Sequence, residues 1–157
     1  MTIEVVPTVS DMVNWLQEDL KNERKHMNFY IRAAACFRNH PLRPEMKEFF
    51  QEESRDELKH VEQFSEQIVL LGSTPLEGAN ETPIVKDWSN LNEILDCAIE
   101  MEEEVAKNYA RRVKATDELE NATMIEMNEF YIDQLRDSWR TAKELQLWKR
   151  NGERSAH

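Results

Sequence analysis

Hydrophobic residues recur along most of the chain at alternating steps of three and four positions, with few interruptions. This spacing is typical of α-helices that bury one face, and it predicts helices rather than strands. The pattern divides into four long stretches, so we expect an all-α protein. The stretches run from about Asp11 to Arg38, from Pro44 to Leu71, from Asn90 to Thr116 and from Asp117 to Arg150.

The ends of these stretches carry residues that commonly begin or end helices. Asn39-His40-Pro41 is expected to stop the first helix, because proline lacks the backbone donor. Gly72 is expected to end the second, because glycine readily adopts the left-handed conformation of a helix end. Elsewhere a polar residue is followed three positions later by an acidic one, as in a capping box. These pairs are Thr8 with Asp11, Asn90 with Glu93 and Asp117 with Glu120.

The lengths of the connections predict how the helices are arranged. The first and last connections are short, so each joins an antiparallel helical hairpin. The segment from Ser73 to Asp87 is too long for a simple turn, and we expect it to cross the full length of the bundle. We therefore predict one domain over residues 1–157, an antiparallel four-helix bundle with a long crossover between helices 2 and 3. Residues 1–9 are expected to form an N-terminal extension and residues 151–157 a flexible tail.

Charge and composition limit the partners and the cellular location expected for this bundle. The formal net charge is −11, whereas nucleic-acid-binding proteins usually present a basic face, so no such partner is expected. No apolar run approaches the roughly 18 residues of a membrane span, and the N-terminal residues do not resemble a signal peptide. Cys36 and Cys97 have no metal-binding or redox spacing and are expected to be reduced thiols. We therefore predict a cytoplasmic protein without a membrane partner.

The most informative residues are acidic side chains on the predicted buried faces. Glu23, Glu57 and Glu102 interrupt the apolar faces of the first three helices near mid-length. A buried carboxylate is unfavourable unless it is paired, so Lys or Arg, protonation or metal ions must compensate these three. His60 lies three residues after Glu57 and shares its helix face. Because carboxylate oxygens with an imidazole nitrogen suit iron or manganese, we expect these four residues to bind metal.

Three strings of the sequence stand out: Asn22-Glu23 followed by Tyr30, Glu53-Ser54-Arg55-Asp56-Glu57-Leu58-Lys59-His60, and Glu102 before Ala106-Lys107-Asn108. These strings resemble bacterioferritins. The resemblance extends from about Val13 to Leu145 and implies a ferritin-like bundle with a di-iron carboxylate centre. It implies Glu23, Glu57, His60 and Glu102 as ligands, with Glu57 and Glu102 bridging two ions.

The fourth helix departs from this family's pattern. The pattern has a second Glu-x-x-His there, whereas this chain has no histidine in that helix. When the start of the fourth helix is aligned with the similar string of the family, Ile132 and Leu135 fall at the two ligand positions. The apolar seam instead points Gln134 inward, and a small change of register would bring in Asp133 or Asp137.

A second Glu-x-x-His occurs in the first helix, formed by Glu23 and His26. His26 would complete a rearranged second metal position if it faced inward. The seam through Met27 instead places His26 at the solvent edge, which is the arrangement we expect. One metal position is therefore better supported than two, with four secondary candidates for ligands: Gln134, Asp133, Asp137 and His26.

The resemblance implies iron, as one or two ions with manganese as an alternative, and dioxygen as a partner. The expected activity is oxidation of Fe(II) by dioxygen, of the ferroxidase type. Two other functions stay open: a di-iron oxygenase acting on a small apolar substrate, and a metal-free structural or interaction bundle. Leu58 stands where bacterioferritins have the methionine that binds haem, so haem is not expected. Since no fifth helix is expected, a homodimer or small homo-oligomer is favoured over a storage shell.

Overall fold

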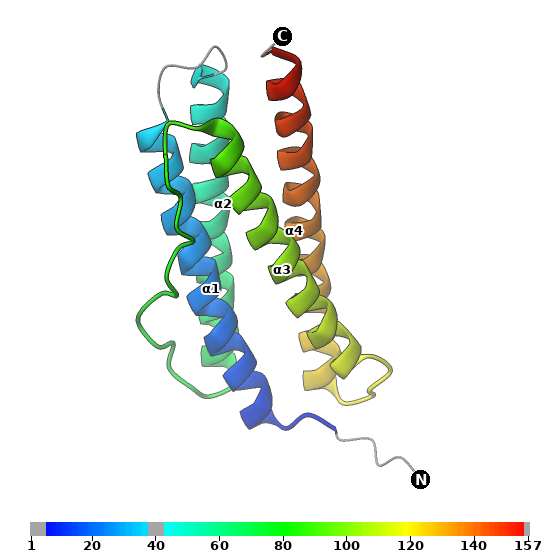
Figure 1. Cartoon of the computed structure of the whole chain (residues 1–157). Helices are drawn as coiled ribbons and strands as arrows, with labels where there is room; N and C mark the ends of the chain where they lie inside the picture. The colour runs from blue at the N-terminus through cyan, green and yellow to red at the C-terminus, as the bar shows by residue number, and fades with distance from the viewer. Residues whose placement is uncertain (1–5, 38–42, 156–157) are drawn as a thin grey trace.

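The computed structural model describes residues 6–37 and 43–155, and this part of the chain forms four helices. They pair as two antiparallel hairpins, the first two helices along each other and the last two likewise (Figure 1). The all-α four-helix bundle is confirmed, while the expected stop at residues 39–41 lies outside the described residues. The helices are α1 (Val9–Cys36), α2 (Arg43–Leu70), α3 (Leu91–Thr116) and α4 (Ala122–Ser155).

Local sequence signals account for most helix ends. The side chain of Thr8 accepts a hydrogen bond from the N–H of Asp11, and the Asp11 carboxylate accepts one from the N–H of Thr8. Asn90 likewise accepts a hydrogen bond from the N–H of Glu93. Gly72 follows α2 with a φ of +84°, in the left-handed region that glycine favours. These predicted caps are therefore confirmed.

The fourth helix differs from its expected boundaries. It begins at Ala122 rather than Asp117, because Asp117 caps the end of α3 instead. Asn121 caps the start of α4, and its side chain accepts a hydrogen bond of 2.9 Å from the N–H of Thr123. The helix also continues to Ser155, so it enters the segment expected to be a flexible tail.

The long connection over residues 71–90 crosses the bundle beside α1 (Figure 1). Gln17 donates a hydrogen bond to the carbonyl of Thr74 and accepts one from the N–H of Leu76, both of 2.9 Å. Arg24 donates to the carbonyls of Leu76 and Gly78, at 2.6 and 2.9 Å. Side chains of α1 thus satisfy backbone groups that the loop cannot pair by itself. The crossover lets α3 begin where α1 ends, as predicted.

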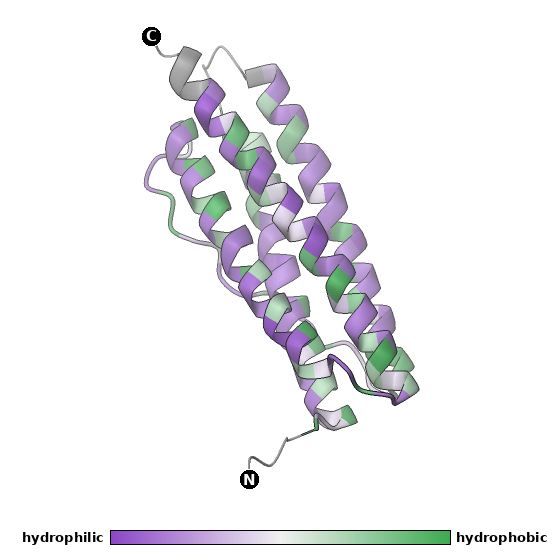
Figure 2. Cartoon of the chain, turned by 90° about the vertical axis from the view of Figure 1, so that its right-hand side faces the viewer, coloured by the Kyte–Doolittle hydropathy of each residue, from purple (hydrophilic) through white to green (hydrophobic). Residues whose placement is uncertain are grey.

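A belt of polar residues crosses the core between two apolar clusters. One cluster, around Phe29 and Phe50, fills the end of the bundle where α3 begins. The other, around Leu20 and Phe64, fills the opposite end. In Figure 2, hydrophobic residues (green) recur along each helix between hydrophilic ones (purple). The buried members of the belt, at mid-length, are Glu23, His26, Glu53, Glu57, His60, Glu102, Gln134 and Ser138.

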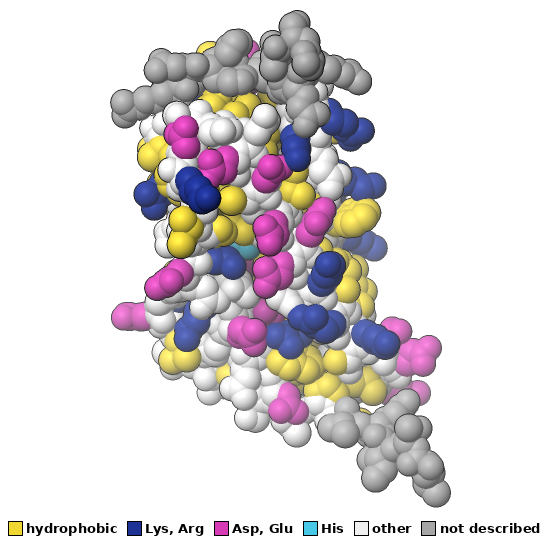
Figure 3. Space-filling model, in the orientation of Figure 1, with side chains coloured by type: hydrophobic (Ala, Val, Ile, Leu, Met, Phe, Trp, Pro, Cys, Tyr) yellow, Lys and Arg dark blue, Asp and Glu magenta, His cyan; other side chains and the backbone are white. Residues whose placement is uncertain are grey.

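The surface is charged and mixed in sign. Figure 3 shows acidic side chains interspersed with Lys and Arg over one face of the molecule. Within residues 6–37 and 43–155, no helix is both long and apolar enough to cross a membrane.

Candidate metal centre

Three of the expected ligands meet at the centre of the polar belt. The Nδ1 atom of His60 lies 3.3 Å from Oε2 of Glu23 and 3.3 Å from Oε2 of Glu57. Each residue offers a ligand atom, and these atoms all lie within 4.8 Å of one another. Two donor atoms bound to one ion at about 2.1 Å each can lie up to about twice that distance apart, which is close to the separations found here. These three residues, one from α1 and two from α2, have the donors and spacing to hold a metal ion.

Glu102 of α3 belongs to a second group of the same kind. Its ligand atom lies within 4.8 Å of those offered by Glu57 and His26. The Nδ1 atom of His26 is 3.4 Å from Oε1 of Glu102, and both side chains are only 1% exposed. Glu57 is common to both groups, so the structure brings all four primary candidates and His26 together.

The position of His26 corrects the sequence prediction. His26 is buried and Met27 is only partly so, whereas we expected Met27 on the seam and His26 at the solvent edge. The buried face of α1 also includes Phe29 and Ala33. His26 lies three positions from Glu23 and three from Phe29, so these three share one face. The buried face of α1 is therefore centred nearer to His26 than the sequence predicts.

Two tyrosines hold the outer carboxylates of the centre. The hydroxyl of Tyr30 donates a hydrogen bond of 2.8 Å to Oε1 of Glu102, and the hydroxyl of Tyr109 donates to Oε1 of Glu23. Burial and the neighbouring carboxylates raise the pKa of both tyrosines well above the ordinary value. The phenols therefore remain protonated donors and orient the two carboxylates.

Asp137 of α4 contacts the other nitrogen of His60. Its Oδ2 lies 3.2 Å from Nε2 of His60, on the side of the ring away from Glu23 and Glu57. A carboxylate that accepts the Nε2 proton leaves Nδ1 free to bind a metal, and it fixes the orientation of the ring. Asp137 is thus placed to support a ligand, whereas we considered it as a ligand itself.

The remaining candidates on α4 do not contact the two groups. Gln134 points inward as the seam predicted, and its amide donates a hydrogen bond of 2.8 Å to Gln63. Asp133 is 75% exposed and pairs with Arg136 at 4.0 Å, and it belongs to neither group. Ile132 and Leu135, which the alignment with the family placed at ligand positions, are only partly buried.

Protons compensate the buried charges in the protein without metal. Burial raises the pKa of Glu57 well above its ordinary value, and the charge of Glu23 raises it further. Burial alone would raise the pKa of Glu23, but hydrogen bonds from Glu57 and His60 lower it. Burial would lower the pKa of His60, yet hydrogen bonds to Asp137, Glu23 and Glu57 raise it far above the ordinary value. These shifts favour a proton on Glu57 and on His60, beside an ionised Glu23.

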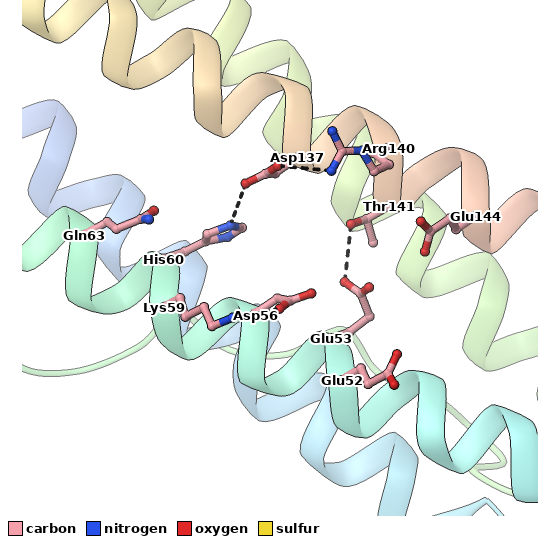
Figure 4. A pocket seen from close by; sticks show the side chains of 10 residues that line it. All are labelled: Glu52, Glu53, Asp56, Lys59, His60, Gln63, Asp137, Arg140, Thr141 and Glu144. Atoms are coloured by element: carbon pink, nitrogen blue, oxygen red, sulfur yellow. Dashed lines mark hydrogen bonds and ion pairs between the residues drawn. The ribbon is translucent and has the colours of Figure 1, made fainter.

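An acidic cavity leads to this centre. Its volume is about 410 Å³, and it opens between α2 and α4 with His60 in its wall (Figure 4). Glu53 is 7% exposed, and Thr141 donates a hydrogen bond of 3.3 Å to its Oε2. Burial raises the pKa of Glu53 to about 8, helped by the charges of Glu102, Asp56 and Glu144. The sequence prediction does not include Glu53 among the site residues, although its position four residues before Glu57 places both on one helix face.

Comparison with known proteins places these observations in a family context. Residues 13–151 match the family model of the ferritin-like domain. A ferritin-like, diiron-carboxylate protein of Bacillus anthracis is 27% identical, with a TM-score of 0.79 over 95% of this chain and 99% of that one. No protein of curated function matches the sequence.

Two less similar structures support the fold alone. The bacterioferritin of Rhodobacter capsulatus, described with a metal-free dinuclear site and haem iron, is 18% identical with a TM-score of 0.78, over 92% of this chain and 87% of that one. A dodecameric thioferritin of Bacteroides fragilis is 14% identical with a TM-score of 0.73, over 96% of this chain and 92% of that one.

Proposed function

This chain belongs to the ferritin-like domain family, and we propose that it binds iron at the buried carboxylate and histidine groups and oxidises Fe(II) with dioxygen there. One observation carries the proposal: Glu23, Glu57 and His60 converge in the core with ligand atoms within 4.8 Å of one another. Fe(II) is the substrate in this reaction, and each ion would give one electron to dioxygen. The similar Bacillus anthracis protein is called a diiron-carboxylate protein, which supports iron as the metal.

The residues present fit a metal ion better than another buried cation. In the part of the chain that the structure describes, no Lys or Arg forms an ion pair with Glu23, Glu57 or Glu102. Their partners are tyrosine hydroxyls and histidine nitrogens. Oxygen and imidazole donors suit iron, with manganese as an alternative. A divalent ion would replace the protons on Glu57 and His60 and satisfy the carboxylates together.

The protein's own residues prepare the centre for this chemistry. Asp137 holds His60 so that Nδ1 faces the carboxylates. Tyr30 and Tyr109 fix Glu102 and Glu23 by hydrogen bonds. The acidic cavity between α2 and α4 raises the local concentration of cations near His60 (Figure 4).

The cavity distinguishes this function from an oxygenase with an apolar substrate. Its wall is formed largely by charged and polar side chains, which would disfavour an apolar molecule: Glu52, Glu53, Asp56, Lys59, His60, Gln63, Asp137, Arg140, Thr141 and Glu144. A metal-free structural bundle, the other alternative, makes a different prediction. Its carboxylates would need permanent partners in the protein, and metal would not bind.

Three further parts of the proposal concern the setting of the centre. A cytoplasmic location suits Cys36 and Cys97, which are free thiols. Leu58 is 47% exposed on α2 and has no sulfur to bind haem, which supports a protein without haem. A homodimer or small homo-oligomer stays a prediction, and sedimentation velocity of the purified protein tests it.

Anaerobic titration of the metal-free protein with Fe(II), followed by air, tests the function. We expect saturable binding and then the absorbance of Fe(III) as dioxygen is consumed. Glu57→Ala and His60→Ala should each remove one of these ligands and abolish binding at their shared position. Glu62→Ala, at an exposed position on the same helix, is the matched control and should bind like the wild type. Binding no stronger than that of an unrelated protein would reject the proposal.

A further inference from the structure

The two Glu-x-x-His pairs of this chain lie on neighbouring helices. Glu23 and His26 are on α1, and Glu57 and His60 are on the antiparallel α2. Ferritin-like dinuclear sites typically take one Glu from each of two helices and a Glu-x-x-His from each of the other two. Here Glu102 of α3 is the remaining carboxylate, and the fourth helix has no such pair.

At the level of the metal centre, two side chains of α4 are already engaged. Asp137 contacts the Nε2 atom of His60, on the side away from the carboxylates. Thr141 donates its hydroxyl to Glu53. Among the described residues, neither group of candidate acidic and histidine ligands includes a residue of α4.

His26 is a histidine beside the candidate ligands whose two ring nitrogens are left unsatisfied. It is 1% exposed, and neither ring nitrogen has a hydrogen-bond partner. Although Nδ1 lies 3.4 Å from Oε1 of Glu102, the two atoms lack the geometry of a hydrogen bond. Leaving a buried polar group unpaired costs about 1–3 kcal/mol. An imidazole next to two carboxylates, with both nitrogens unpaired, is suited to bind a cation.

We propose that His26, Glu57 and Glu102 bind a second metal ion, so that this chain forms a dinuclear site from α1, α2 and α3 without a ligand from α4. The ligand atoms of this group lie within 4.8 Å of one another. Glu57 belongs to both groups, and its two oxygens allow it to bridge the ions. The inference rests on the proposed function, which needs only the first position. Two Fe(II) ions held together would supply the two electrons that, with two protons, reduce one dioxygen molecule to hydrogen peroxide, so the second position would speed the reaction.

Metal stoichiometry tests this inference without relying on activity. Metal-free protein is titrated anaerobically with Co(II), which absorbs visible light when bound, and the end point is repeated with Fe(II) by equilibrium dialysis. We expect two ions per wild-type chain and one per chain for His26→Leu. Gln134→Leu is the matched control, because it also removes a buried polar group with an unpaired atom from the same belt. It should still bind two ions.

Each outcome has a separate meaning. Two ions in both the wild type and His26→Leu would overturn the role of His26. One ion in the wild type would overturn the second position and leave the proposed function intact, whereas no ion would overturn both. Circular dichroism checks that the variants fold. If His26→Leu does not fold, Glu102→Gln keeps the size of the side chain and should also reduce the stoichiometry to one.

Discussion

Metal binding at this centre should compete with protons, and the structure fixes the direction. The pKa values of Glu57 and His60 are both raised, so a proton competes with a metal ion for each of the two groups. A metal ion needs the unprotonated carboxylate and the unprotonated Nδ1 atom. Acidification favours the protonated forms further, so affinity must fall as the pH falls.

The size of the effect follows from the number of protons displaced. Filling the position of Glu23, Glu57 and His60 should release about two protons, one from Glu57 and one from Nδ1 of His60. Each proton contributes about 1.4 kcal/mol per pH unit, or a factor of ten in affinity. The first ion should therefore bind roughly a hundredfold more tightly at pH 7 than at pH 6.

Isothermal titration calorimetry with Co(II) measures this directly. Titrations at one pH in buffers with different ionisation enthalpies give the number of protons released per ion. Glu57→Gln has no proton to lose at that position, so its remaining binding should release about one proton instead of about two. Equal affinity at pH 6 and pH 7, or no proton release in the wild type, would refute the assignment of protons to Glu57 and His60.

Of three further predictions, one concerns Asp137, and two concern the buried Asp19 of α1 and its partner Tyr131 of α4. Asp137→Asn should weaken metal binding about 10–100-fold, because His60 loses the carboxylate that orients it; the exposed Asp133→Asn should leave the Co(II) titration unchanged, and equal effects would contradict this role. Burial raises the pKa of Asp19 from 3.8 to about 6, so the folded protein binds this proton more tightly than the unfolded chain. The protonated carboxyl therefore contributes stability at acid pH, and this contribution is lost as the pH rises through 6. Asp19→Asn should therefore increase the free energy of unfolding in urea at pH 8 by up to about 3 kcal/mol, with less gain at pH 4; a loss at pH 8 would count against this. Tyr131→Phe should lower the free energy of unfolding by about 1–3 kcal/mol, since Asp19 loses a donor at 2.6 Å, and unchanged urea midpoints would disprove it.

Periodicity and helix breakers were sufficient to predict the fold because both act locally. Each helix must bury its apolar stripe, and residues such as Thr8 and Gly72 end helices through contacts with their nearest neighbours in the chain. The same apolar stripes contain Glu23, Glu57 and Glu102, and a carboxylate is unusual at a buried position. Their convergence could be expected from the sequence, since only a shared cation or shared protons make such burial tolerable.

Only the tertiary structure decided which face of α1 is buried and how far α4 is shifted along its axis relative to α2. His26 and Met27 are about 100° apart around the helix, and a buried stripe is at least that wide, so periodicity alone cannot choose between them. Packing against the other helices buries His26 beside Glu102. Likewise, which residue of α4 meets His60 depends on how far α4 slides along α2. A helical repeat describes one helix by itself and contains no information about that offset, so Asp137 could be assigned only from the folded bundle.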